Sequence, residues 1–66
     1  MHYFTISLLN SPLELLTYKS KIDIEIGTKV SIHVRNRIVN GVIISTCEKP
    51  SFECLEILEV LNFFYS

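Results

Sequence analysis

The sequence has few cysteines and few histidines. Cys47 and Cys54 are its only cysteines, and His2 and His33 are far from them along the chain. Zinc sites are typically built from paired cysteine or histidine ligands at short, regular spacing, and no such spacing is present. A secretory feature is also missing. We therefore expect a reduced intracellular protein whose thiols are buried, with no metal and no other cofactor in this chain.

Long apolar runs are missing as well. No stretch reaches the roughly 18 apolar residues of a membrane-spanning helix. The start, His2-Tyr3-Phe4, lacks the basic region of a signal peptide. We expect a cytoplasmic protein with no membrane partner. The chain has neither a Walker-type phosphate-binding loop nor residues that assemble a nucleophile, a base and an oxyanion site, so we expect no enzyme active site here.

The net charge is small, −1 at pH 7, which is not typical of a protein that coats duplex nucleic acid. The distribution of the charges is more informative. Up to Cys47 there are five lysines and arginines against three acids, a balance of +2. From Glu48 on there is one lysine against four acids, a balance of −3. An anionic partner is therefore expected to contact the first part.

The strongest pattern runs from Gly27 to Ser45 and predicts a β-hairpin that holds most of the core. Apolar and polar residues alternate from Lys29 to Val34, as in a strand with one buried face. A second β-branched run follows. Two turn sites compete between them: Asn40-Gly41 is the stronger dipeptide signal, and Arg35 to Arg37 is the more polar stretch. If the turn is at Arg35, Gly41 lies inside a strand and marks a bulge or a close backbone approach.

The flanking segments are less uniform. His2 to Leu9 alternates and predicts a first strand. Ser11-Pro12-Leu13-Glu14 has the local pattern of a helix start, with an extended connector or short strand as the alternative. Lys19 to Lys21 is predicted to be a solvated loop. The alternating Ile22 to Gly27 fits an edge strand or an extended lead-in, and Phe52 to Leu61 fits either a helix or a strand.

Several short segments, taken in order, resemble a known family. They are an N-terminal strand, Ser11-Pro12-Leu13 followed by Leu16-Thr17-Tyr18, Ile24 to Val30, a basic corner, Gly41 to Ile44, and Ile57 to Leu61. Together they resemble the N-terminal domain of the primosomal protein N′ (PriA) family, the bacterial replication-restart helicases. The resemblance runs through nearly the whole chain, although each segment alone is short and apolar.

The resemblance implies a small domain that captures the 3′ end of a DNA strand, such as the nascent strand at a stalled fork, in a shallow pocket for the terminal nucleotide. Its expected partners are DNA 3′ ends at branched or single-stranded sites, the helicase core of the same polypeptide and other primosome proteins. Residues 1–66 would be a single domain of a longer ATP-dependent DNA helicase. The apolar end, Asn62 to Ser66, also suggests that the natural chain continues.

The resemblance also implies a fold: all-β, a small twisted antiparallel sheet or partly open barrel of about five strands. It places the hairpin turn at Arg35 to Arg37 and Gly41 within a strand. It makes Leu13 to Tyr18 extended and Leu55 to Leu61 a strand, against the local helix patterns. The residues expected to bind nucleic acid are Leu16, Thr17, Tyr18, Arg35, Asn36 and Arg37.

Three positions depart from the family pattern. Leu16-Thr17-Tyr18 stands where the family usually has Phe-Asp-Tyr, so a hydroxyl replaces an acid that helps to read the terminal nucleotide. His33 to Asn36 contains neither the proline nor the glycine that often follow the preceding strand. Leu55 stands where a lysine is frequent.

Other interpretations of the same residues are open. The two arginines also fit a solvated turn, and Tyr18 also fits the edge of the core. A second function is an intramolecular or protein–protein docking domain with little DNA affinity. It is suggested by the three departures, the acidic tail and the aromatic end Phe63-Phe64-Tyr65.

Overall fold

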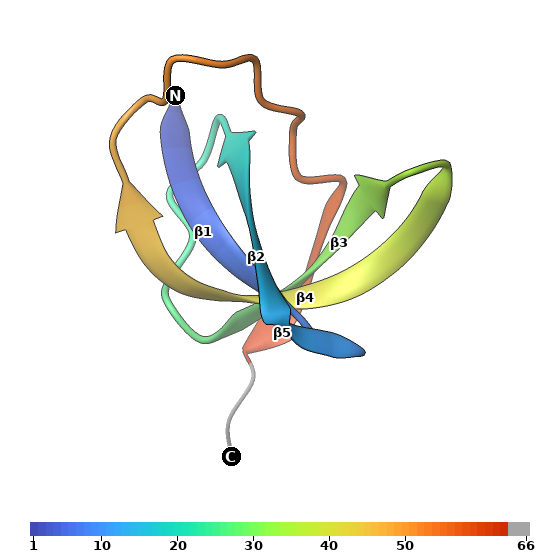
Figure 1. Ribbon diagram of the computed structural model, residues 1–66. Helices are drawn as coiled ribbons and strands as arrows, with labels where there is room; N and C mark the ends of the chain where they lie inside the picture. The colour runs from blue at the N-terminus through green and yellow to red at the C-terminus, as the bar shows by residue number, and fades with distance from the viewer. Residues whose placement is uncertain (64–66) are drawn as a thin grey trace.

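The computed structural model describes residues 1–63, and five β-strands make up its regular structure (Figure 1). The strands are β1 (His2–Leu8), β2 (Ser11–Ser20), β3 (Thr28–Val34), β4 (Arg37–Cys47) and β5 (Glu59–Phe63). They form one sheet in the order β2-β1-β4-β3-β5, and all neighbouring strands are antiparallel. The predicted all-β fold is confirmed. Within residues 1–63 there is no helix long and apolar enough to cross a membrane.

The sheet curls until its two edges are connected at one end. The Lys19 N–H donates to the Leu55 carbonyl at 3.0 Å, and the Lys19 carbonyl accepts from the Ile57 N–H at 2.9 Å. The Leu58 N–H donates to the Ser31 carbonyl at 2.9 Å, so the segment before β5 ties β2 to β3. Register shifts in three of the four strand pairings assist the curl, because bulges bend strands. Figure 1 shows the resulting curvature of β1 and β4.

The core fills the concave side of this sheet. Its buried members are Phe4, Ile6, Leu8, Tyr18, Ile24, Val30, Ile32 and Ile43. The prediction that Gly27 to Ser45 holds most of the core is wrong, because that stretch supplies three of these eight side chains and β1 also supplies three. β1 contributes as much because its alternate residues Phe4, Ile6 and Leu8 all face the core, whereas β4 supplies only Ile43.

The hairpin turns at Arg35 and Asn36, as the resemblance implied. Their φ angles are 48° and 68°, and Val34 pairs with Arg37. Positive φ at both central residues is the requirement of a two-residue type I′ turn. Asn40 and Gly41 lie inside β4, so the competing turn site is wrong.

The other ambiguous segments are now defined. Leu13 to Tyr18 is extended, because β2 pairs along β1. The predicted loop at Lys19 to Lys21 is wrong for Lys19 and for Ser20, which end β2 opposite Tyr3 and His2. Residues 22–27 form a lead-in without a strand: Ile24 is buried in the core, and Gly27 turns the chain with φ 96°.

The last strand begins later than predicted, at Glu59 rather than Leu55. Residues 55–58 form no continuous strand: Glu56 makes one isolated bridge with Lys19 of β2, and Leu58 then bonds to Ser31 of β3. The cysteine prediction is half right: Cys54 is buried, which raises the pKa of its thiol, but Cys47 is exposed and both are free. Of the aromatic end, Phe64 and Tyr65 lie outside the described residues.

Candidate nucleic-acid site

The six predicted site residues come from two parts of the sheet that are not neighbours in strand order. Leu16, Thr17 and Tyr18 lie in the second half of β2, at one edge. Arg35 and Asn36 form the β3–β4 turn, and Arg37 is the first residue of β4. Since β1 lies between β2 and β4, only the curl of the sheet can bring these two parts together.

Two contacts connect β2 to the hairpin across the open side of the sheet. The Tyr18 hydroxyl donates a hydrogen bond of 2.6 Å to the His33 carbonyl. The guanidinium of Arg35 contacts the carboxylate of Glu14, with 3.3 Å between Nη2 and Oε2. The first contact is partly buried and the second is exposed. The structure therefore places the start of β2 beside the hairpin turn.

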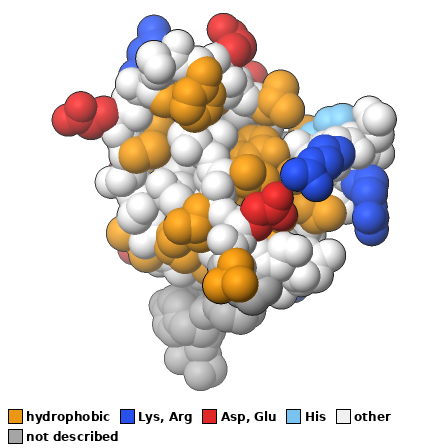
Figure 2. All heavy atoms as spheres, viewed as in Figure 1, with side chains coloured by type: hydrophobic (Ala, Val, Ile, Leu, Met, Phe, Trp, Pro, Cys, Tyr) orange, Lys and Arg blue, Asp and Glu red, His pale blue; other side chains and the backbone are white. Residues whose placement is uncertain are grey.

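A small hollow of about 120 Å³ lies between the start of β2 and the hairpin. Apolar side chains and several polar or charged ones surround it: Leu8, Asn10, Ser11, Glu14, Val34, Arg35, Arg37 and Val39. In Figure 2 basic side chains project together on one side of the molecule, with an acidic side chain next to them. The hollow thus combines two cations, one anion and neutral hydrogen-bonding groups.

The hollow takes in only part of the predicted site. Arg35 and Arg37 line it, whereas Leu16, Thr17, Tyr18 and Asn36 do not. Leu16 packs on the core, and Tyr18 is 6% exposed, which favours the core interpretation of this tyrosine. Thr17 lies between them on the strand, so its side chain points to the outer face.

Asn10, Ser11 and Glu14 also line the hollow, although the sequence patterns did not predict them as site residues. Glu14 belonged to the predicted helix start. The available signal was the position of Glu14 as a lone carboxylate among leucines, which is unusual in an apolar strand. Glu14 could be assigned to the site only once β2 was known to be extended, with Glu14 in contact with Arg35 of the hairpin turn.

The free edge of β2 adds unpaired main-chain groups beside the hairpin. Lys19 turns its N–H and C=O away from β1, because both bond to residues 55 and 57. Main-chain direction alternates along an antiparallel pair, so Thr17 and Leu15 turn theirs the same way. The hydrogen bonds among the described residues give these groups no backbone partner. This edge can therefore donate and accept hydrogen bonds.

The charges of the hollow are accessible to a ligand. The Arg35 side chain is 81% exposed and that of Glu14 is 42% exposed. Exposed ion pairs contribute only about 0–1 kcal/mol, so the contact with Glu14 does not prevent Arg35 from binding a phosphate. Arg37 has no carboxylate within ion-pair distance among residues 1–63. Two guanidinium groups can thus turn toward an anionic ligand without disturbing the core.

Tyr18 leads to a testable prediction about alkaline pH. Burial raises the pKa of Tyr18 above its ordinary value of 10.0 in the folded chain. The folded state therefore holds this proton more tightly than the unfolded state. The contribution of Tyr18 to stability is complete below pH 10 and is lost as the pH rises through the folded pKa, with a slope of at most about 1.4 kcal/mol per pH unit.

The measurement is urea unfolding followed by circular dichroism between pH 8 and pH 11, on the natural chain and on Tyr18→Phe. At pH 8 the variant should be less stable by about 1 kcal/mol, because it loses the bond to His33. Above pH 10 this difference should shrink. Parallel stability curves over the whole range would contradict the prediction.

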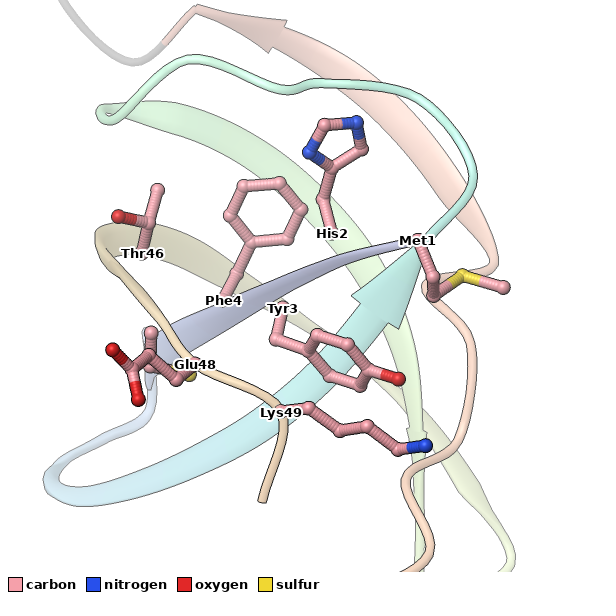
Figure 3. A pocket seen from close by; sticks show the side chains of 8 residues that line it. Met1, His2, Tyr3, Phe4, Thr46, Glu48 and Lys49 are labelled. Carbon is pink, nitrogen blue, oxygen red and sulfur yellow. The ribbon is translucent and has the colours of Figure 1, made fainter.

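A larger hollow, of about 600 Å³, lies between the start of β1 and the end of β4, and none of the predicted site residues line it. Figure 3 shows why its side chains do not converge: His2 and Phe4 rise on one side of β1, and Tyr3 lies on the other side beside Lys49. Among the described residues no three His, Cys, Asp or Glu side chains form a group that could hold a metal ion. The hollow at the hairpin is therefore the better candidate.

Two curated proteins are similar to this chain. Each is named "Replication restart protein PriA", one from Helicobacter pylori strain 26695 and one from strain J99, and each is 42% identical over 57 residues. The match covers 86% of this chain, whereas the chain spans 9% of the length of these relatives. No family model matches the chain, and no solved structure matches it. Over these 57 residues the chain is homologous to a segment of the replication restart protein PriA.

Proposed function

We propose that this chain is a DNA-binding module that captures the 3′ end of a nascent strand during replication restart. The observation that carries the proposal is the homology to a segment of PriA, combined with a hollow whose rim holds two accessible arginines. In this proposal residues 1–66 form the N-terminal domain of a cytoplasmic, ATP-dependent DNA helicase. The helicase core of the same polypeptide and other primosome proteins are its partners, and catalysis lies outside this chain.

The positions of the arginines and of the free edge of β2 suggest how the end of the DNA strand is held. Arg35 and Arg37 contact the phosphates next to the end, because guanidinium groups bind phosphate oxygens through paired donors. The free main-chain groups of Leu15 and Thr17 offer hydrogen bonds to the terminal base. Such bonds do not need the acid that the family usually has at position 17. Tyr18 holds β2 and the hairpin in place through its bond to His33.

The first test compares three single-stranded oligonucleotides of one sequence by fluorescence anisotropy. One has a free 3′ end, one is a closed circle, and one has an inverted 3′–3′ linkage, which leaves only 5′ ends. The chain is expected to bind the first more tightly than the other two. Two phosphate contacts predict a shallow slope of about −1.4 in log K against log salt. Equal binding to all three would show that the 3′ end is not recognised.

Single arginine variants test the contacts. Arg35→Ala and Arg37→Ala should each weaken binding and reduce the size of the salt slope by about 0.7. Lys21→Ala removes a cation from the loop after β2, away from the hollow, and serves as the matched control. If Lys21→Ala weakens binding as much as the arginine variants do, the cations act only through net charge.

A docking domain is the second candidate, and exposed apolar side chains favour it. Leu13 is 99% exposed, and many other large hydrophobic residues are exposed on the described part of the chain. Figure 2 shows such side chains in several places on one face. NMR shift mapping separates the two functions. Shifts at the hairpin on adding oligonucleotide support end binding, whereas shifts only at the outer apolar residues on adding the helicase core support docking.

A further inference from the structure

Glu14 is the one acidic side chain on the rim of the hollow at the hairpin. It comes from β2, and the two arginines of the rim come from the turn and from β4. One carboxylate oxygen, Oε2, is in contact with Arg35 at 3.3 Å. The other oxygen, Oε1, makes no hydrogen bond or ion pair among the described residues. A carboxylate thus lies beside the groups that we propose to bind phosphate.

An ionised carboxylate only accepts hydrogen bonds. It can accept one from a hydroxyl group, and it repels a phosphate that comes to the same place. A purely cationic hollow would favour the phosphate instead. Glu14 therefore gives the hollow a preference that its arginines alone do not have.

The size of the hollow fits the 3′ end of a DNA strand. Pockets that enclose a whole small molecule usually measure about 300–1,000 Å³, whereas this one measures about 120 Å³. It can take the hydroxyl end of a terminal sugar while the base and the phosphate stay outside. Arg35 can contact that phosphate while it still bonds to Glu14, because guanidinium carries five N–H donors.

We infer that Glu14 is a specificity-determining residue that accepts a hydrogen bond from a free 3′-hydroxyl group and excludes a 3′-phosphate. This inference rests on the proposed 3′-end binding. Glu14 would also place a carboxylate next to the end of the DNA strand, where the family usually has an acid at position 17 and this chain has a threonine. The carboxylate of Glu14 comes from the same β-strand, three residues before Thr17, and it is in contact with Arg35.

The test uses two linear oligonucleotides that differ only in their 3′ group, hydroxyl or phosphate. The natural chain should prefer the hydroxyl by roughly tenfold or more, the scale of one charged hydrogen bond. Glu14→Gln should reduce the preference to within about twofold, because an amide is neutral and can donate to a phosphate. Glu14→Asp keeps the charge and should keep a larger preference than Glu14→Gln. Glu25→Gln removes an exposed acid from the loop before β3 and should change nothing.

The outcomes separate the inference from the proposed function. If the natural chain prefers a free 3′ end to a closed circle but binds hydroxyl and phosphate ends equally, the inference fails and end binding stands. An unchanged preference in Glu14→Gln overturns the role of Glu14 in the same way. If the chain binds the circle as well as the linear strand, the proposed function itself fails. Circular dichroism of each variant confirms that it is folded.

Discussion

Phe4→Ala is expected to remove a large part of the folding stability of this chain. Phe4 is fully buried near the middle of the curled sheet, between partners on β2 and β4. Truncating a buried phenylalanine to alanine costs about 3–5 kcal/mol, from the lost burial and from the cavity left behind. A 66-residue domain has roughly 3–10 kcal/mol of stability in total. The loss therefore equals a large part of what holds this fold.

The measurement is a urea or thermal unfolding curve followed by far-ultraviolet circular dichroism. The melting temperature should fall by more than about 12 °C, since each kcal/mol shifts a domain of this size by about 4–8 °C. Leu13→Ala is the matched control, because it also removes a large apolar side chain but from a position that is 99% exposed. It should change stability by less than about 0.5 kcal/mol. A similar loss in both variants would mean that Phe4 is not part of a packed core.

The alternation of apolar and polar residues was enough to predict β1 and β3, and a β-branched run predicted β4. Patterns of period two are set by which face of a strand is buried. The pattern failed at Ser11 to Tyr18, where capping signals favoured a helix. There the resemblance was needed, because the pairing of β2 with β1 is a long-range contact that local propensity does not contain.

The hairpin shows how a local turn signal can be overruled. Asn-Gly is the stronger type I′ dipeptide, yet the chain turns at Arg35 and Asn36. A turn at Asn40 would remove Gly41 from β4, where the glycine lets β1 come close. The packing of β1 against β4 at Gly41 therefore determined the position of the hairpin turn.

The candidate site was only partly predictable for the same reason. Arg35 and Arg37 stand out in the sequence because they form a basic corner. Glu14 does not, since its position beside Arg35 results from the curl of the whole sheet. The predicted residues Leu16 and Tyr18 were found on β2, but their side chains face the core. The family resemblance pointed to the two segments, and the fold determined which of their side chains reach the hollow.

Gly41→Ala is expected to destabilise the chain by about 1–3 kcal/mol, the usual cost of overpacking. A Cβ at this position would lie 2.5 Å from Cγ2 of Ile6 and 3.1 Å from the Ser7 carbonyl oxygen. Cγ2 is attached directly to the Cβ of a fully buried, β-branched side chain, so it cannot move without rotating χ1 in the core. The backbone of β1 blocks the other direction.

The sign of the effect decides between two explanations. If Gly41 were only a weak strand residue, alanine would stabilise the chain by about 0.5–1 kcal/mol. If Gly41 allows a close approach, alanine must destabilise it. The change in the free energy of unfolding is measured from the midpoints of urea unfolding curves, provided that their m-values are equal. Asn40→Ala, the neighbouring exposed position on β4, is the control and should stay within about 0.5 kcal/mol.

A double-mutant cycle with Ile6→Leu tests the contact itself. Leucine has nearly the volume of isoleucine but no methyl branch at Cβ, and such swaps usually cost less than about 1.5 kcal/mol. In the Ile6→Leu background Gly41→Ala should cost at least about 0.5 kcal/mol less than in the natural chain, which is the coupling expected of side chains in contact. If the two costs are additive, Ile6 is not what excludes a side chain at position 41. The packing of β1 on β4 would then depend on the Ser7 backbone alone.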